Sequence, residues 1–173
     1  MTLALGCRLP DGVLRESTGF DENSGCPIKP DTISVAEAAN GKKIIIFGVP
    51  GAYTPTCSAQ HLPEFLALHD AIKASGVDEI WCFSVNDAFV MAAWGRERHA
   101  SGKIRMMADG GAVYSRQLGL DQDLTEKGMG IRCVRFALIA DDGVISYLTI
   151  ESPGEFKGSR AEAVLAALQE HRA

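Results

Sequence analysis

The sequence predicts an α/β sandwich in which helices flank a mixed central β-sheet. Residues 44–47 form an unbroken apolar run, typical of a strand buried in a parallel sheet. Strand-like and helix-like apolar spacings then alternate through the first two-thirds of the chain. Near the C-terminus, Asp141-Asp142-Gly143 separates two β-rich runs and predicts a hairpin turn. Parallel strands linked by helices, followed by an antiparallel hairpin, make a mixed sheet.

The N-terminal part predicts short strands and turns with little helix. One short strand is expected at residues 13–16, inside a hairpin-rich segment, residues 8–31, that is punctuated by Pro10, Gly12, Gly19, Gly25, Pro27 and Pro30. A helical turn is expected at residues 35–39, because Asn40-Gly41 is a helix stop signal. The central strand follows at residues 43–47.

The rest of the chain predicts three further α/β steps and a final hairpin and helix. A helix over residues 56–74 is interrupted by Pro63, which we expect to kink or loosen its first turns. The other expected elements are strands at 79–85 and 103–107, helices at 88–98 and 113–118, hairpin strands at 134–140 and 144–150, and a helix at 160–173. This order is typical of thioredoxin-like folds, and we expect one domain over residues 1–173.

Composition and charge exclude several functional classes. The formal net charge is -5 and the basic residues are dispersed, which argues against a nucleic-acid surface. No segment approaches the roughly 18 consecutive apolar residues of a membrane span. The first residues lack the charged region of an export signal. No C-x-x-C pair occurs, so we expect neither a zinc site nor a disulfide framework, and we expect a reducing cytoplasmic location; the five cysteines are Cys7, Cys26, Cys57, Cys82 and Cys133.

Cys57 lies where the central strand gives way to the following helix. Pro50 and Pro55 stiffen the turn, while Thr54 and Thr56 are available as helix caps. Backbone N–H groups and the helix dipole stabilise negative charge in a first helical turn. The sequence therefore favours a thiolate at Cys57, the nucleophilic form of the side chain.

A thiolate in this position has three candidate reactions: disulfide exchange, acyl transfer and peroxide reduction. Exchange of the C-x-x-C type is excluded, because Thr54 and Gln60 occupy the positions of a partner cysteine. A cysteine hydrolase needs a general base, and His61 is the only histidine near Cys57 in sequence; a structural role suits it better. Peroxide reduction needs only hydrogen-bond donors around the reacting oxygens, and a threonine, a backbone N–H and an arginine would suffice.

Residues 50–58 read P-G-A-Y-T-P-T-C-S and resemble the P-x-x-x-T-x-x-C signature of peroxiredoxins. Segments 61–63, 84–94, 108–112 and 132–144 are similar to the type II, or peroxiredoxin-5, subfamily in its plant-type and bacterial branch. The resemblance implies a homodimer and a thioredoxin-like fold, to which the turn residues of 8–31 add an N-terminal β-hairpin segment. It also implies a thiol-dependent peroxidase that reduces hydrogen peroxide and small alkyl hydroperoxides without metal, haem or flavin.

The resemblance also implies roles for single residues. Cys57 would attack the peroxide and become a sulfenic acid, Thr54 would hydrogen-bond the thiolate and the peroxide, and Pro50 would shield the pocket from water. Arg135 matches the family's active-site arginine. Arg132 is the competing candidate, but the odd offset between the two would point them to opposite faces of one strand, so we expect only one of them beside Cys57.

The resolving step leaves two interpretations open. Cys82 lies 25 residues after Cys57 (82 - 57), as does a second cysteine in plant-type and many bacterial relatives, yet it also sits in an apolar strand as a core residue would. A bridge to Cys57 would require their Cα atoms to come within about 7 Å. The resemblance suggests an external reductant, either glutathione with glutaredoxin or thioredoxin. The alternative function is a peroxide-sensing or chaperone-like redox interaction protein.

Overall fold

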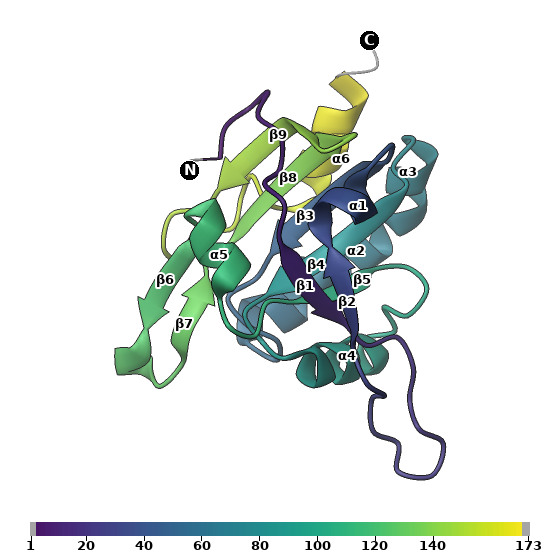
Figure 1. Cartoon of the computed structure of the whole chain (residues 1–173). Coiled ribbons are helices and arrows are strands. Elements are labelled where there is room, and N and C mark those ends of the chain that lie inside the picture. Colours follow the sequence, from purple (N-terminus) through teal and green to yellow (C-terminus); the bar gives the residue numbers. More distant parts are fainter. Residues whose placement is uncertain (1–2, 171–173) are drawn as a thin grey trace.

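A seven-stranded sheet forms the centre of the computed structural model, which describes residues 3–170 (Figure 1). The strand order is β2-β1-β5-β4-β3-β8-β9. The strands are β1 (Val13–Glu16), β2 (Asp31–Ser34), β3 (Lys43–Gly48), β4 (Glu79–Ser84), β5 (Arg105–Ala108), β8 (Phe136–Asp141) and β9 (Val144–Ile150). Because β3, β4 and β5 are parallel while β1, β2, β8 and β9 add antiparallel pairs, the predicted mixed sheet is confirmed.

Helices cover both faces of this sheet. The face formed by Ile45, Phe47 and Cys82 packs against α2 (Leu62–Ala67), α3 (His69–Ala74), α4 (Ala88–Glu97) and α6 (Ala161–Glu170). The opposite face, which includes Trp81 and Phe136, packs against α1 (Val35–Ala39) and α5 (Val113–Leu118). Two core clusters therefore lie on either side of the buried central strand β3, as its apolar run predicts.

The structure adds three strands that the sequence did not predict. Strand β2 pairs with β1, and the 14 residues between them form a long loop that extends beyond the sheet (Figure 1). Strands β6 (Asp121–Leu124) and β7 (Gly130–Cys133) form a separate two-stranded sheet. A 3-10 turn, η2 (Thr125–Lys127), connects them. These strands lack long apolar runs, which is why the apolar pattern did not reveal them.

The helix expected at residues 56–74 is divided into three pieces. A π-helical turn, η1 (Cys57–His61), precedes α2, and Leu68 separates α2 from α3 with φ -96° and ψ 7°. Pro63 lies at the start of α2, where its missing N–H removes a bond to the preceding turn. The wider π turn therefore lies immediately before the proline. The expected final helix ends at Glu170, and residues 171–173 lie outside the described residues.

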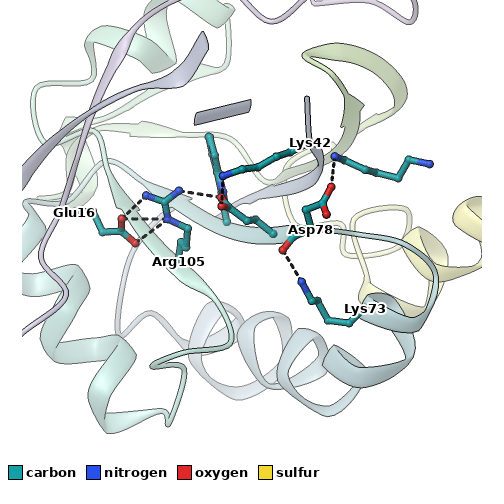
Figure 2. Close-up of polar contacts among 8 residues, drawn as sticks. Glu16, Lys42, Lys73, Asp78 and Arg105 are labelled. Atoms are coloured by element: carbon teal, nitrogen blue, oxygen red, sulfur yellow. Dashed lines mark hydrogen bonds and ion pairs between the residues drawn. The ribbon is translucent and has the colours of Figure 1, made fainter. Parts of the chain in front are cut away.

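A charged network ties together the ends of β1, β4 and β5 away from Cys57 (Figure 2). Arg105 donates to Glu16 at 2.6 Å and to Glu79 at 2.9 Å. Lys42 donates to Glu79 at 2.6 Å. Burial raises the pKa of Glu79, but hydrogen bonds from Lys42, Arg105 and Trp81 outweigh it and lower that pKa to about 2. The network therefore links three neighbouring strands of the sheet, β1, β5 and β4.

Candidate active site

The segment that carries Cys57 is held by groups from neighbouring strands and helices. Ala52 N–H donates to the side-chain oxygen of Asn86 at 3.0 Å. In the π turn, the Leu62 N–H donates to the Cys57 carbonyl. Ser58 accepts a hydrogen bond from the indole N–H of Trp94 at 3.0 Å. These contacts fix the backbone on both sides of Cys57, whose side chain is fully buried.

Arg135 reaches Cys57 from a segment almost eighty residues away. Its Nη2 lies 3.3 Å from the Cys57 Sγ, and its Nη1 lies 2.8 Å from Nδ1 of His61. The guanidinium also lies over the ring of Phe156, with its carbon 5.4 Å from the ring centroid. A cation at hydrogen-bond distance from sulfur stabilises the thiolate over the thiol. The site thus pairs a buried nucleophile with a fixed positive charge.

His61 orients the guanidinium of Arg135. An arginine N–H can only donate, so Nδ1 of His61 accepts, and Nε2 carries the proton that it donates to the Ser159 carbonyl at 2.8 Å. Burial, and secondarily the charge of Arg135, lowers the pKa of His61 to about 3. The imidazole is therefore neutral at physiological pH and serves as an acceptor. His61 therefore has a structural role, as expected. Its hydrogen-bond partners are distant in sequence, and no sequence signal indicated Ser159.

Thr54 and Pro50 lie on the same turn as Cys57, but the contacts of Thr54 differ from those expected. The Thr54 hydroxyl donates to the Gly51 carbonyl at 2.8 Å, instead of to the Cys57 sulfur. Its oxygen lone pairs remain available to accept a hydrogen bond from a ligand. Both Thr54 and Pro50 are partly exposed at the mouth of the site.

Arg132 and Arg135 are kept apart for a reason other than strand parity. Arg135 lies in the connection between β7 and β8, so the expectation that it sits on the first strand of the late hairpin was wrong. Arg132 belongs to β7 and donates to the Pro50 carbonyl at 3.2 Å and to the Met129 carbonyl at 2.7 Å. Of the two arginines, Arg135 makes the hydrogen bond to Cys57, and Arg132 supports the turn beside it.

Two other buried cysteines, Cys82 and Cys133, lie near the site, and their burial disfavours the reactive thiolate form. Cys82 is paired with Phe47 of β3 on one side and Met106 of β5 on the other, and is fully buried. Burial raises its pKa well above the ordinary value, and burial raises that of Cys133 to about 12. Cys133 donates its thiol proton to the Val49 carbonyl at 3.0 Å. In the structure both are therefore thiols of the core.

A groove of about 390 Å³ opens beside Arg135. Its lining includes Pro50, Thr56, Gln60 and Arg135, and also residues of β6 and η2, Val134 and residues 151–156. No three histidine, cysteine or acidic residues gather as metal ligands within residues 3–170. In that same part of the chain, every helix is too short or too polar to cross a bilayer.

Comparisons with known proteins agree with this arrangement. Residues 5–165 match the Redoxin family model. The chain is 47% identical over 166 residues to Peroxiredoxin-2B of Arabidopsis thaliana, covering 96% of this chain and 98% of that protein. It is 46% identical to Peroxiredoxin-2C of Oryza sativa subsp. japonica, with the same coverage. The solved structure of reduced Prx3 from Vibrio vulnificus in complex with hydrogen peroxide is 44% identical, covers 96% of this chain and 99% of its own, and superposes with a TM-score of 0.86.

Matches of this length and identity extend well beyond the cysteine motif. The relatives align over nearly the whole chain, and their names agree with the resemblance in residues 50–58 and with the thioredoxin-like fold. The chain therefore belongs to the peroxiredoxin family, and it is an enzyme, an oxidoreductase with thiol peroxidase activity.

Proposed function

We propose that Cys57 is the peroxidatic cysteine and that its contact with Arg135 drives the reaction. The Cys57 thiolate attacks one oxygen of the peroxide, an S–O bond forms as the O–O bond breaks, and the electron pair leaves with the other oxygen. Protonation of that oxygen gives water or an alcohol, and Cys57 becomes a sulfenic acid. The main support for this proposal is the 3.3 Å distance between Arg135 Nη2 and Cys57 Sγ. It places an N–H donor of Arg135 beside the atoms whose charge changes during the attack.

Thr54 and Pro50 prepare the peroxide for this attack. With its proton held by the Gly51 carbonyl, the Thr54 oxygen accepts a hydrogen bond from the peroxide O–H and so orients the O–O bond toward sulfur. Pro50 offers no N–H and limits the access of water to the sulfur. Within the proposal, His61 acts indirectly, because it contacts Arg135 and holds the guanidinium in place.

The proposed substrates are hydrogen peroxide and small alkyl hydroperoxides. The complete burial of Cys57 supports a small reacting group, and the Vibrio vulnificus relative was solved in complex with hydrogen peroxide. We propose a cytoplasmic location, in keeping with free cysteines at all five positions, and a homodimer, in keeping with exposed apolar side chains at Tyr53, Phe89 and Val113.

We propose that an external thiol regenerates Cys57. The thiol sulfur attacks the sulfenic sulfur, water leaves, and a mixed disulfide forms that a second thiol resolves. Glutathione with glutaredoxin, or thioredoxin, would supply these thiols. The position of Cys82 supports an external donor, because Cys82 is hydrogen-bonded into the sheet between two strands and would have to leave β4 to reach Cys57.

Peroxide consumption by a Cys57→Ser variant tests the proposal. We expect this variant to lose about three orders of magnitude or more of its activity, as enzymes do when their nucleophile is removed. The control variant Cys26→Ser, which replaces an exposed cysteine, should keep the wild-type activity. Substantial turnover by Cys57→Ser would overturn the assignment. With thiol present, wild-type consumption that stops after one equivalent of peroxide would instead establish the sensor alternative.

A further inference from the structure

The groove beside Arg135 is much larger than the peroxide bond that reacts there. A water molecule in the liquid fills about 30 Å³, so a volume of about 390 Å³ exceeds the needs of hydrogen peroxide many times over. The groove shares Pro50 and Arg135 with the active site, and Arg135 contacts Cys57. Its remaining space is therefore placed to hold the body of a larger reactant whose reacting group lies beside Arg135.

The acidic side chains in the groove are already satisfied by the protein. Glu151 accepts hydrogen bonds from the backbone N–H groups of Lys157 and Ser159, at 2.7 and 2.8 Å, and from the Ser159 hydroxyl. Burial raises the pKa of Glu151, but these bonds outweigh it and lower the pKa overall. Glu155 is paired with the Lys157 ammonium at 2.7 Å. Both carboxylates therefore already have partners within the protein, so we do not expect either of them to bind a cation from solution strongly.

The two basic side chains that line the groove, Arg135 and Lys127, differ in their contacts. Arg135 is committed to Cys57 and His61. Lys127, at the last position of η2, lines the groove, and in residues 3–170 its ammonium makes no hydrogen bond or ion pair. Leu124 and Val134 supply apolar lining nearby. The groove thus offers one uncommitted cation next to apolar surface, and its other charges are paired.

We propose that the groove is a carboxylate-recognition site, in which Lys127 binds the carboxylate of a small organic reactant whose peroxide or thiol group is presented to Cys57. This inference rests on the proposed peroxidase function. Two classes of reactant carry the required chemistry: a hydroperoxide of an organic acid, and a thiol with a carboxylate. In either case the ammonium of Lys127 pairs with the carboxylate, and the apolar wall covers the short carbon chain between the two ends of the reactant.

Matched acid and ester pairs test each class separately. The peroxide arm measures the rate of Cys57 oxidation by 3-hydroperoxy-3-methylbutanoic acid and by its methyl ester. The thiol arm measures reduction of the Cys57 sulfenic acid by 3-mercaptopropionate and by its methyl ester, with rates expressed per thiolate because the two thiols ionise differently. The fluorescence of Trp94, which is bonded to Ser58, offers a stopped-flow signal.

The measured quantity is the ratio of acid to ester rates in the wild type, Lys127→Gln, Lys127→Glu and a control, Lys29→Gln. Lys29 is exposed in the loop between β1 and β2, and its replacement by glutamine changes the net charge by the same amount as Lys127→Gln. In at least one arm we expect the ratio to fall roughly fivefold in Lys127→Gln, to fall further in Lys127→Glu, and to stay at the wild-type value in Lys29→Gln. The responding arm identifies the class of reactant.

Equal ratios in the wild type and both Lys127 variants, in both arms, would overturn the carboxylate site. An equal fall in Lys29→Gln would also overturn it, because the effect would then come from overall charge. Failure of the peroxidase proposal looks different: wild-type Cys57 would not be oxidised by hydrogen peroxide at all. Because each ratio is taken within one variant, a change in general activity does not imitate loss of carboxylate recognition.

Discussion

The neutral, buried state of His61 predicts a specific dependence of stability on pH. The pKa of His61 is about 3 in the folded protein, compared with an ordinary value of 6.5. The unfolded chain therefore binds the additional proton between these values. Because the folded pKa is the lower one, the contribution to stability is complete above pH 6.5 and is lost as the pH falls toward 3.

The size of the effect follows from the interval. Between pH 6.5 and pH 5.0 the unfolded histidine gains a proton that the folded one refuses, and each unit is worth about 1.4 kcal/mol, so we expect a loss of about 2 kcal/mol in the free energy of unfolding. This pH range lies well above the pKa of Glu79, which is about 2, so Glu79 contributes little to the change.

Urea unfolding at pH 7.5 and 5.0 measures this contribution when the wild type is compared with His61→Gln. Glutamine also offers a neutral acceptor and donor but cannot take up the proton, and every other residue is the same in the two proteins. The variant will be less stable at both pH values, because it loses the ring contacts of His61 with Phe47 and Phe156. The wild type should lose about 2 kcal/mol more than the variant on acidification. Equal losses in the two proteins would refute the reasoning.

Three further predictions concern the site and its support. Arg135→Ala should slow sulfenic acid formation by roughly 100-fold, and Arg135→Lys by less, in stopped-flow measurements with hydrogen peroxide; unchanged rates would remove Arg135 from the mechanism. Cys82→Ala should retain turnover with an external thiol, and mass spectrometry of the peroxide-treated wild type should show a Cys57 adduct with that thiol; a bridge from Cys57 to Cys82 would contradict the external route. Gly48→Ala should lower the free energy of unfolding by about 1–3 kcal/mol, because the added methyl group meets the ring of Phe136; calorimetry that shows no change would contradict this packing.

The sequence predicted the elements whose residues are strongly patterned. The apolar run at residues 44–47 and the hairpin turn at Asp141-Asp142-Gly143 each produce a local signal, and the structure places β3 and the turn between β8 and β9 there. The strands β2, β6 and β7 were not predicted, because their side chains are largely exposed or half-buried and form no long apolar run.

Sequence motifs predicted which residues lie together at the site, but they did not predict the hydrogen bonds that these residues make. Thr54 and Cys57 lie on one turn, so their closeness follows from spacing, yet the direction of the Thr54 hydroxyl depends on the Gly51 carbonyl. The pairing of His61 with Ser159 and Arg135 joins three segments that are remote in sequence. Contacts of that kind depend on how the helices pack on the sheet, which local patterns do not specify.

Formation of the reactive site during folding requires the pairing of β3 with β8. In that ladder Gly48 is opposite Phe136, so Pro50 and Arg135 are brought together only when two strands some ninety residues apart in sequence have come into register. Ladders of such long range close late, because loop entropy opposes them until other contacts have formed. Return of rapid reaction with peroxide on refolding should therefore follow, and never precede, the formation of this ladder, so that chemical reactivity itself reports a late stage of folding.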